Sequence, residues 1–332
     1  MRQCRVRALP STVFSIISLT ILPVLTNVFT KKQYLCRQQK NTDLFMRIAI
    51  FGTTYDHQYN QCLQDVVNIL GSNGASIIFE KTFRKYIDGQ ITLSGVETAE
   101  ADSVDADIAI SFGGDGTFLA TSQMLAKKGT PILGINAGHL GFLADVSAHE
   151  LEQVLLDILS GRYKIEKRVM LQMKLSNDTD TSYTALNEIA ILRHDTSSMI
   201  AVDVTIDGEF VANYKSDGLL VATPTGSTAY SLSLGGPIVS PNSANFLIVP
   251  IAPHSLTVRP LVIRDDCRID VCVKSRSGNY RIGVDGHSIN LDESTTIAIE
   301  KSRYQTNSIQ PLDHTFFRTL SNKLMWGADT RV

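Results

Sequence analysis

The chain changes its pattern once along its length, and this change limits the folds that it can adopt. Between residues 46 and 162, apolar strand-like runs alternate with helical patterns, which is typical of a parallel sheet covered by helices. From residue 163 to residue 311, strand-like runs follow one another with few helical patterns between them, which is typical of a β-sandwich. The sequence therefore predicts an α/β plus all-β chain: an N-terminal Rossmann-like parallel-sheet domain followed by a C-terminal β-sandwich domain.

The elements of this plan can be placed from hydrophobic periodicity and turn residues. In the first domain we expect strands over residues 47–52, 76–79, 107–112 and 131–135, and helices over 60–70, 117–127 and 150–159. Ser147 and Glu150 form a capping-box pattern before the last of these helices. In the second domain we expect strands over 168–175, 183–192, 200–206, 209–214, 218–222, 246–251, 260–263, 268–274, 279–284 and 295–300. A final helical pattern over 314–325 has an apolar face, so we expect residues 312–327 to pack back on the first domain.

The first 45 residues differ from the rest of the chain. Basic residues precede an apolar run over residues 13–29, a pattern that signal peptides and short membrane anchors share. No clear small-residue cleavage site follows, and residues 46–52 resemble the first strand of an α/β domain. We favour the hypothesis that translation starts at Met46, so that residues 1–45 are not part of the mature fold. A genuine targeting segment is the alternative.

Charge and cysteine content argue against several classes of function. The formal net charge of −2 gives no reason to expect nucleic acid or an anionic membrane surface as a partner. The five cysteines are scattered and contain no CxxC pair, so neither a disulfide framework nor a zinc site is indicated, and we assign no protein metal ligands. Reduced thiols are typical of the cytosol, so we expect a cytoplasmic protein.

A glycine-rich loop lies between a buried strand and a helix. The apolar run over 108–112 ends in Gly113, Gly114, Asp115 and Gly116, and a helical pattern follows. Glycines allow backbone N–H groups to approach an anion, and a helix N-terminus favours negative charge, so this arrangement suits phosphate. The carboxylate of Asp115 suggests a general base, or a partner for a metal that accompanies the phosphates. The alternative is a tight turn in which Asp115 is the helix N-cap.

A second motif lies in the predicted β domain, where a strand runs into a segment rich in hydroxyl groups over residues 223–233. Such groups suit polar recognition of ribose, phosphate or amide groups, although an ordinary Ser/Thr-rich loop with an Asx turn at Asp217 is the alternative. Four other polar residues also have two interpretations. Asn187 and Glu188 form either a solvent-facing strand edge or a ligand contact, Lys215 a surface ion pair or a phosphate contact, and His287 a hairpin residue or a ligand contact.

These motifs together resemble those of NAD kinase. The resemblance depends on Gly113-Gly-Asp-Gly116, then Asn187-Glu188, then the Thr-Pro-Thr-Gly-Ser-Thr-Ala-Tyr segment that starts at Thr223, in that order and spacing, and it covers residues 46–326. It implies ATP-dependent phosphorylation of the ribose 2′-hydroxyl of the adenosine in NAD, which gives NADP. It also implies a divalent cation, usually Mg²⁺, and a homo-oligomer, either a dimer or a tetramer, with sites near subunit contacts.

The resemblance also implies roles for individual residues. Asp115 is expected to accept the proton of the ribose hydroxyl, and the amides of the glycine loop with Mg²⁺ to hold the donor phosphates. Gly116 and Phe142 are expected to line the adenine side of the NAD site, with Asn187 on the adenosine half and Lys215 and Asp217 beside the hydroxyl-rich motif. The full set of expected binding residues is Gly113, Gly114, Asp115, Gly116, Phe142, Asn187, Glu188, Lys215, Asp217, Ser227, Thr228, Ala229, Tyr230, Ser231, Leu232, Ser233 and His287.

Two other functions remain as alternatives. A lipid kinase of the diacylglycerol or sphingoid type shares the glycine loop, but the polar motif after Thr223 suits a dinucleotide better than an acyl chain. A non-catalytic NAD(P)-sensing module would keep the pocket, but it would gain little from a carboxylate facing phosphates.

Overall fold

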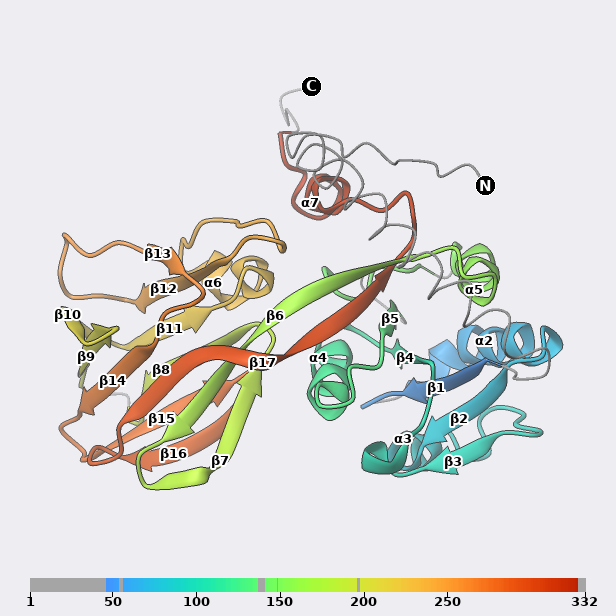
Figure 1. The fold of residues 1–332 in the computed structure, drawn as a ribbon, viewed down its shortest axis with the longest axis horizontal. Helices are drawn as coiled ribbons and strands as arrows, with labels where there is room; N and C mark the ends of the chain where they lie inside the picture. Colours follow the sequence, from blue (N-terminus) through green and yellow to red (C-terminus); the bar gives the residue numbers. More distant parts are fainter. Residues whose placement is uncertain (1–45, 54–55, 137–140, 148, 196–197, 328–332) are drawn as a thin grey trace, which may run out of the picture. The chain divides into compact units, whose positions relative to one another are not determined.

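The first half of the chain forms a parallel sheet. The computed structural model describes residues 46–53, 56–136, 141–147, 149–195 and 198–327, so the hypothesis about residues 1–45 lies outside the described part. The strands β1 (Arg47–Phe51), β2 (Ser76–Glu80), β3 (Glu97–Ala99), β4 (Ile108–Phe112) and β5 (Ile132–Ile135) pair in the order β5-β4-β1-β2-β3. Every pairing among them is parallel, which confirms the predicted sheet (Figure 1).

Helices cover both faces of this sheet because β1 is apolar on both sides. Ile48 and Ile50 pack with residues of α2 (Asn60–Ser72) and α5 (Leu151–Leu159), whereas Ala49 and Phe51 pack with residues of α4 (Asp115–Leu125). A strand buried on both faces shows a continuous apolar run rather than an alternation, as β1 does. The segment between β2 and β4 contains α3 (Lys81–Tyr86), the short strand β3 and a 3₁₀ turn, η2 (Ala101–Ser103). Another 3₁₀ turn, η1 (His57–Tyr59), precedes α2.

The second half consists of antiparallel strands, as predicted. They are β6 (Lys164–Leu175), β7 (Asp178–Ala185), β8 (Glu188–Arg193), β9 (Ile200–Ile206), β10 (Glu209–Ser216), β11 (Gly218–Ala222), β12 (Asn245–Ile251), β13 (Leu261–Arg264), β14 (Ile269–Lys274), β15 (Asn279–Val284), β16 (His287–Asp292) and β17 (Ile297–Gln310). One sheet has the order β13-β12-β11-β8-β15-β16, and β9, β10, β14, β17, β6 and β7 belong to the other. A shared apolar core includes side chains from both sheets, which makes this half a sandwich.

One strand joins the two halves into a single sheet. β17 has 14 residues, pairs with β6 in antiparallel fashion, and pairs with β5 in parallel through Ser308 and Ile132. The sequence predicted a strand over 295–300 only, because polar residues after Glu300 interrupt the apolar alternation. The pairing of β17 with β6 is irregular between Lys301 and Gln305 and then resumes, so the strand continues into the first half.

Three local predictions were wrong. The strand expected over 183–192 is two strands, because the chain leaves β7 at Ala185 and enters β8 at Glu188. The capping-box prediction was wrong in detail: the Ser147 hydroxyl does donate to the Glu150 carboxylate, but the helix N-cap is Glu150. The alternative in which Asp115 is an N-cap was also wrong, since Gly114 is the N-cap of α4 and Asp115 is its first residue.

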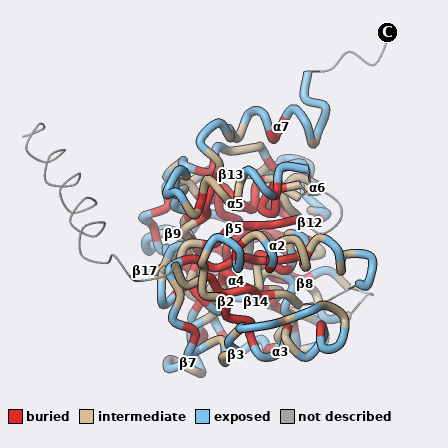
Figure 2. Tube along the Cα trace, turned by 90° about the vertical axis from the view of Figure 1, so that its right-hand side faces the viewer, coloured by how far each residue is buried: buried red, intermediate tan, exposed pale blue. Residues whose placement is uncertain are grey.

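The last helix, α7 (Phe316–Leu324), is tied to the first half of the chain, as predicted. Asp145, which follows β5, contacts three residues in and just before this helix. Its carboxylate lies 2.7 Å from Nε2 of His314, accepts from Oγ1 of Thr319 at 3.0 Å, and lies 3.7 Å from Nζ of Lys323. Within α7 only Thr319 and Leu320 are buried, so most of its surface is exposed (Figure 2). No helix of the described residues is long and apolar enough to span a membrane.

Candidate active site

The Asp115 carboxylate is held by the loop that follows β5. It accepts hydrogen bonds from the backbone N–H groups of Phe142 at 2.8 Å, Leu143 at 3.0 Å and Ala144 at 3.0 Å. A carboxylate has about four acceptor positions, so about one is left for another donor. The position is fixed by Gly141 as well, because a Cβ atom there would lie 1.8 Å from Oδ1 of Asp115. The carboxylate is thus held in one orientation, with room for a single further hydrogen bond.

The glycine loop has the geometry that its sequence predicts. Gly113 has a φ of +152°, and a Cβ atom there would lie 2.4 Å from Oγ1 of Thr117, so a larger residue would not fit. Gly114 and Gly116 have open space where a side chain would be. The loop therefore leaves its backbone accessible at the N-terminus of α4, where an anion is favoured.

Two cations, Arg168 and Lys323, interact with the charge of Asp115, and neither could be predicted from the sequence. The Arg168 side chain, on β6, is 5% exposed, and its Nη2 pairs with the Glu166 carboxylate at 2.8 Å. Burial lowers the pKa of the Arg168 guanidinium, while the charges of Glu166 and Asp115 oppose this shift. Burial likewise lowers the pKa of the Lys323 ammonium, and Asp145 and Asp115 oppose it. An arginine in a strand and a lysine in an amphipathic helix are both common, so neither residue type indicates a functional site. Only the tertiary structure shows that both lie within reach of the charge of Asp115.

The break between β7 and β8 is stabilised by another carboxylate. Asp285 accepts from the backbone N–H groups of Leu186 at 2.6 Å, Asn187 at 2.9 Å and Glu188 at 3.0 Å. Burial raises the pKa of Asp285, and these three donors counteract the shift. The hydroxyl-rich motif packs on the same segment, since the N–H of Thr223 donates to the Asn187 carbonyl at 2.9 Å. Asn187 and the start of the motif are therefore neighbours, although they are far apart in the sequence.

Glu188 is partly buried, and one of its carboxylate oxygens lacks a hydrogen-bond partner. Its Oε2 atom has no hydrogen-bond partner, although the backbone N–H of Tyr230 donates to the carboxylate. Burial, and then the nearby charge of Asp285, raise the pKa of Glu188 from its ordinary value of 4.5 to about 7. A strongly shifted carboxyl beside an accessible tyrosine is a common feature of functional sites.

The hydroxyl-rich motif forms a 3₁₀ turn, η3 (Thr225–Thr228), and one helical turn, α6 (Tyr230–Ser233). Ser227 is buried and stabilises the fold, because its hydroxyl donates to the Pro224 carbonyl and accepts from the N–H of Val239. Ser231 is also buried, whereas Thr228, Ala229 and Leu232 are partly exposed and Tyr230 and Ser233 are exposed. The exposed members are the ones available to a ligand.

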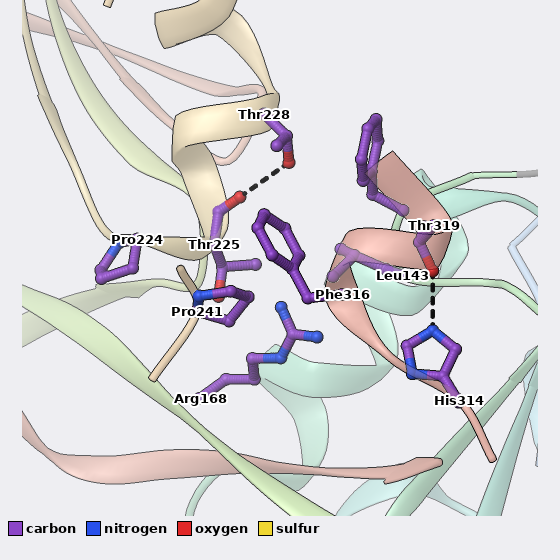
Figure 3. A pocket seen from close by; sticks show the side chains of 10 residues that line it. Leu143, Arg168, Pro224, Thr225, Thr228, Pro241, His314, Phe316 and Thr319 are labelled. Atoms are coloured by element: carbon purple, nitrogen blue, oxygen red, sulfur yellow. Dashed lines mark hydrogen bonds between the residues drawn. The ribbon is translucent and has the colours of Figure 1, made fainter. Parts of the chain in front are cut away.

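A small cavity lies between the loop after β5, the hydroxyl-rich motif and the region of α7. Its volume is about 10 Å³, which is about the space for one water molecule. The cavity is lined by the loop after β5, strand β6, the turn η3, the segment around Pro241 and the region of α7 (Figure 3). The lining residues are Phe142, Leu143, Arg168, Pro224, Thr225, Thr228, Pro241, His314, Phe316 and Thr319.

Two predicted binding residues lie away from this group. Lys215 and Asp217 precede β11, whereas the hydroxyl-rich motif follows it, and a strand of five residues spans about 16 Å. Asp217 pairs with Arg193 at 2.9 Å. The expectation that both lie beside the motif in the same chain is therefore not met. His287 is exposed at the start of β16, opposite Val284, which also pairs with Ile189 next to Glu188.

Family models match both halves of the chain. Residues 48–163 match the N-terminal domain of ATP-NAD kinase, and residues 186–310 match its C-terminal domain. The curated NAD kinase of Bacteroides fragilis is 44% identical over 291 residues, which cover 86% of this chain and all of that protein. The NAD kinase of Porphyromonas gingivalis is 40% identical over 287 residues, which cover 86% of this chain and 99% of that protein.

Solved structures show the same fold. Yeast NADH kinase complexed with NADH superposes with a TM-score of 0.80 at 26% identity, covering 88% of this chain and 91% of that chain. The NAD kinase from Archaeoglobus fulgidus in complex with ATP superposes with a TM-score of 0.65 at 28% identity, covering 84% of this chain and 99% of that chain.

Proposed function

The chain belongs to the NAD kinase family, and on this basis we propose that Asp115 is the general base that activates the ribose 2′-hydroxyl of NAD. The reaction transfers the γ-phosphate of ATP to that hydroxyl. A bond forms between the 2′-oxygen and the γ-phosphorus, the bond to the β–γ bridging oxygen breaks, and ADP leaves. The hydroxyl proton passes to Asp115.

One observation supports this role most directly: the Asp115 carboxylate is fixed by three backbone donors and has about one acceptor position left. A ribose hydroxyl that donates to this position would be held in a single orientation. Fixed orientation of the reacting groups is a major source of acceleration in phosphoryl transfer. A carboxylate with no free acceptor position could only stabilise the fold, because it could not accept from a substrate. A carboxylate without fixed donors would not be held in one orientation towards the ribose hydroxyl.

We propose that the donor phosphates bind at the backbone of Gly113, Gly114 and Gly116, near the N-terminus of α4. When Mg²⁺ is bound with the triphosphate, it neutralises part of the negative charge that the transfer moves. No group of three or more His, Cys, Asp or Glu side chains suited to a metal occurs in the described part of the chain. The residues therefore fit a cation that would be held mainly by phosphate oxygens and water.

For NAD we propose the surface formed by Asn187, Glu188, Thr228 and Tyr230. The Glu188 carboxylate can accept from ribose hydroxyl groups, and the side-chain amide of Asn187 can both donate and accept. Lys215 and Asp217 lie at the far end of β11. A dimer or tetramer, which the family resemblance implies, would allow these two residues to reach the NAD bound by a second copy.

We also propose that the enzyme works in the cytoplasm. Cys62, Cys267 and Cys272, the cysteines of the described residues, form no disulfide bond, which is consistent with a reducing compartment. Neither the lipid-kinase alternative nor the sensor alternative is supported, because the relatives described above are named as NAD or NADH kinases.

The test of Asp115 compares the variant Asp115→Asn with the full-length wild-type chain. NADP formed from NAD, ATP and Mg²⁺ is read with an NADP-specific dehydrogenase, and NAD binding is measured separately by calorimetry. We expect turnover to fall by about 10²- to 10⁴-fold, because the amide cannot accept the proton. NAD affinity should stay within about twofold, since the base acts on one hydroxyl only.

The control for this test is Asp102→Asn, which removes an exposed carboxylate from the same half of the chain and should leave turnover unchanged. Turnover of Asp115→Asn close to wild type would show that Asp115 is not the base.

A further inference from the structure

The cavity between η3 and α7 encloses polar atoms that the fold does not satisfy. Arg168 and Thr225 both line the cavity, and Nε of Arg168 and Oγ1 of Thr225 have no hydrogen-bond partner. Figure 3 shows the Arg168 guanidinium directed towards the Phe316 ring, with Pro241 and Thr225 beside it. Buried polar groups in folded proteins are usually paired, and a charged donor is costly to leave unpaired. Unsatisfied donors that converge on one cavity therefore point to a ligand with acceptor atoms.

Arg168 brings a positive charge to the lining of the cavity, and a positive charge favours an anion. Arg168 pairs with Glu166 through Nη2, which leaves its Nε–H and the rest of its planar fork directed elsewhere. Lys323 interacts with the charge of Asp115 as well, but its Nζ is paired with Asp145 at 3.7 Å. A guanidinium fork with a hydroxyl beside it is a combination that binds phosphate oxygens well.

We propose that Arg168, assisted by Thr225, binds the terminal phosphates of the phosphoryl donor, and that Phe316 of α7 covers this subsite while the donor is absent. The proposal rests on the proposed function, since the phosphate that is transferred must lie within reach of Asp115. The loop residues Phe142 and Leu143 bind the Asp115 carboxylate through their N–H groups and also line the cavity, so the cavity adjoins the base.

The size of the cavity explains the part played by Phe316. About 10 Å³ holds no more than one water molecule, so a phosphate can enter only if a lining group moves. Phe316 is the best candidate because it lies in a helix whose surface is mostly exposed and which buries only Thr319 and Leu320. Displacement of its ring would uncover Nε of Arg168 without disturbing either sheet.

The test measures binding without turnover. Calorimetry on the full-length chain gives the Kd of ATP with Mg²⁺, of inorganic tripolyphosphate, and of NAD. For Arg168→Gln we expect the Kd of ATP and that of tripolyphosphate to rise about tenfold or more, because a charge-assisted contact is lost. The Kd of NAD should stay within about twofold. The matched control is Arg264→Gln, which removes the same charge from an exposed ion pair with Asp266.

A second variant distinguishes the loss of a phosphate contact from misfolding. Arg168→Gln leaves Glu166 without its partner, so the double variant Glu166→Gln/Arg168→Gln removes both charges, and we expect the same loss of ATP and tripolyphosphate binding. Phe316→Ala should instead lower the Kd of ATP by about threefold, because the donor no longer has to displace the ring.

Unchanged ATP and tripolyphosphate binding in a folded Arg168 variant would overturn the proposal. Weaker binding of NAD alone would also overturn it, because the subsite would then belong to the diphosphate of the acceptor. Failure of the wild-type chain to form NADP would refute the proposed function separately, since the binding measurements do not depend on turnover.

Discussion

Glu188 should make the stability of this protein depend on pH in a specific window. Its carboxyl is largely buried, its Oε2 has no hydrogen-bond partner, and its pKa is raised from 4.5 to about 7 by burial and then by Asp285. The folded state therefore binds this proton more tightly than the unfolded chain does. The resulting stabilisation is fully present below pH 4.5 and is lost progressively as the pH rises to about 7.

The size of the effect follows from the shift. A pKa difference between 4.5 and about 7 corresponds to about 3 kcal/mol of unfolding free energy at most. The variant Glu188→Gln keeps the size of the side chain but never ionises. Allowing for the part of the carboxyl that solvent reaches, we expect this variant to be about 2 kcal/mol more stable than wild type at pH 8 and nearly equal to it at pH 4.5.

The assay is urea denaturation of the full-length wild type and variant at several pH values from 4.5 to 8.5, followed by circular dichroism. The control is Glu209→Gln, which replaces an exposed carboxylate at the start of β10 and should track wild type at every pH. A difference between Glu188→Gln and wild type that is absent at pH 8, or that grows as the pH falls, would refute the reasoning. NAD binding should weaken in the variant, because an amide oxygen is a poorer acceptor for a ribose hydroxyl than a carboxylate.

Two further predictions concern the backbone around the carboxylates. For Gly141→Ala, whose Cβ atom would lie 1.8 Å from Oδ1 of Asp115, we expect kcat to fall by about 100-fold in the coupled assay, because the carboxylate that we propose as the base is displaced. A kcat close to wild type would contradict the fixed geometry. For Asp285→Asn we expect about 1 to 3 kcal/mol less stability in urea denaturation, because one amide oxygen cannot accept from all three of Leu186, Asn187 and Glu188; an unchanged midpoint would contradict this role. Backbone strain should not contribute to that loss, since Asp285 has a φ of +46°, which asparagine also tolerates.

The sequence was sufficient to predict features that local pattern determines. The apolar run of β4, the glycines after it and the helix that follows predicted the loop that carries Asp115, and the change of pattern after residue 162 predicted the change from a parallel to an antiparallel sheet. Positions that are fixed by distant partners could not be predicted. The donors to Asp115 are backbone groups of Phe142, Leu143 and Ala144, which leave no trace in residue type.

The same limit applies to the break at Asn187. The run from Ala185 to Leu192 is apolar apart from Asn187 and Glu188, so it predicts one strand. Yet Asp285, far along the chain, accepts hydrogen bonds from three consecutive N–H groups at the break between β7 and β8. The length of β17 was missed for the opposite reason. Its second half is polar, but pairing with β6 and β5 satisfies its backbone whatever its side chains are.

The shared strand β17 has a consequence for how the protein loses its structure. Two domains joined by a single linker can melt separately, because few contacts cross between them. In this chain the ladder between β17 and β6 runs from Ile297 to Gln310, and β17 pairs with β5 at Ser308. Melting either half would break hydrogen bonds of the other, so the two cores are coupled into one cooperative unit. The same strand therefore also stabilises the region between the halves, where we propose that the donor and the acceptor bind.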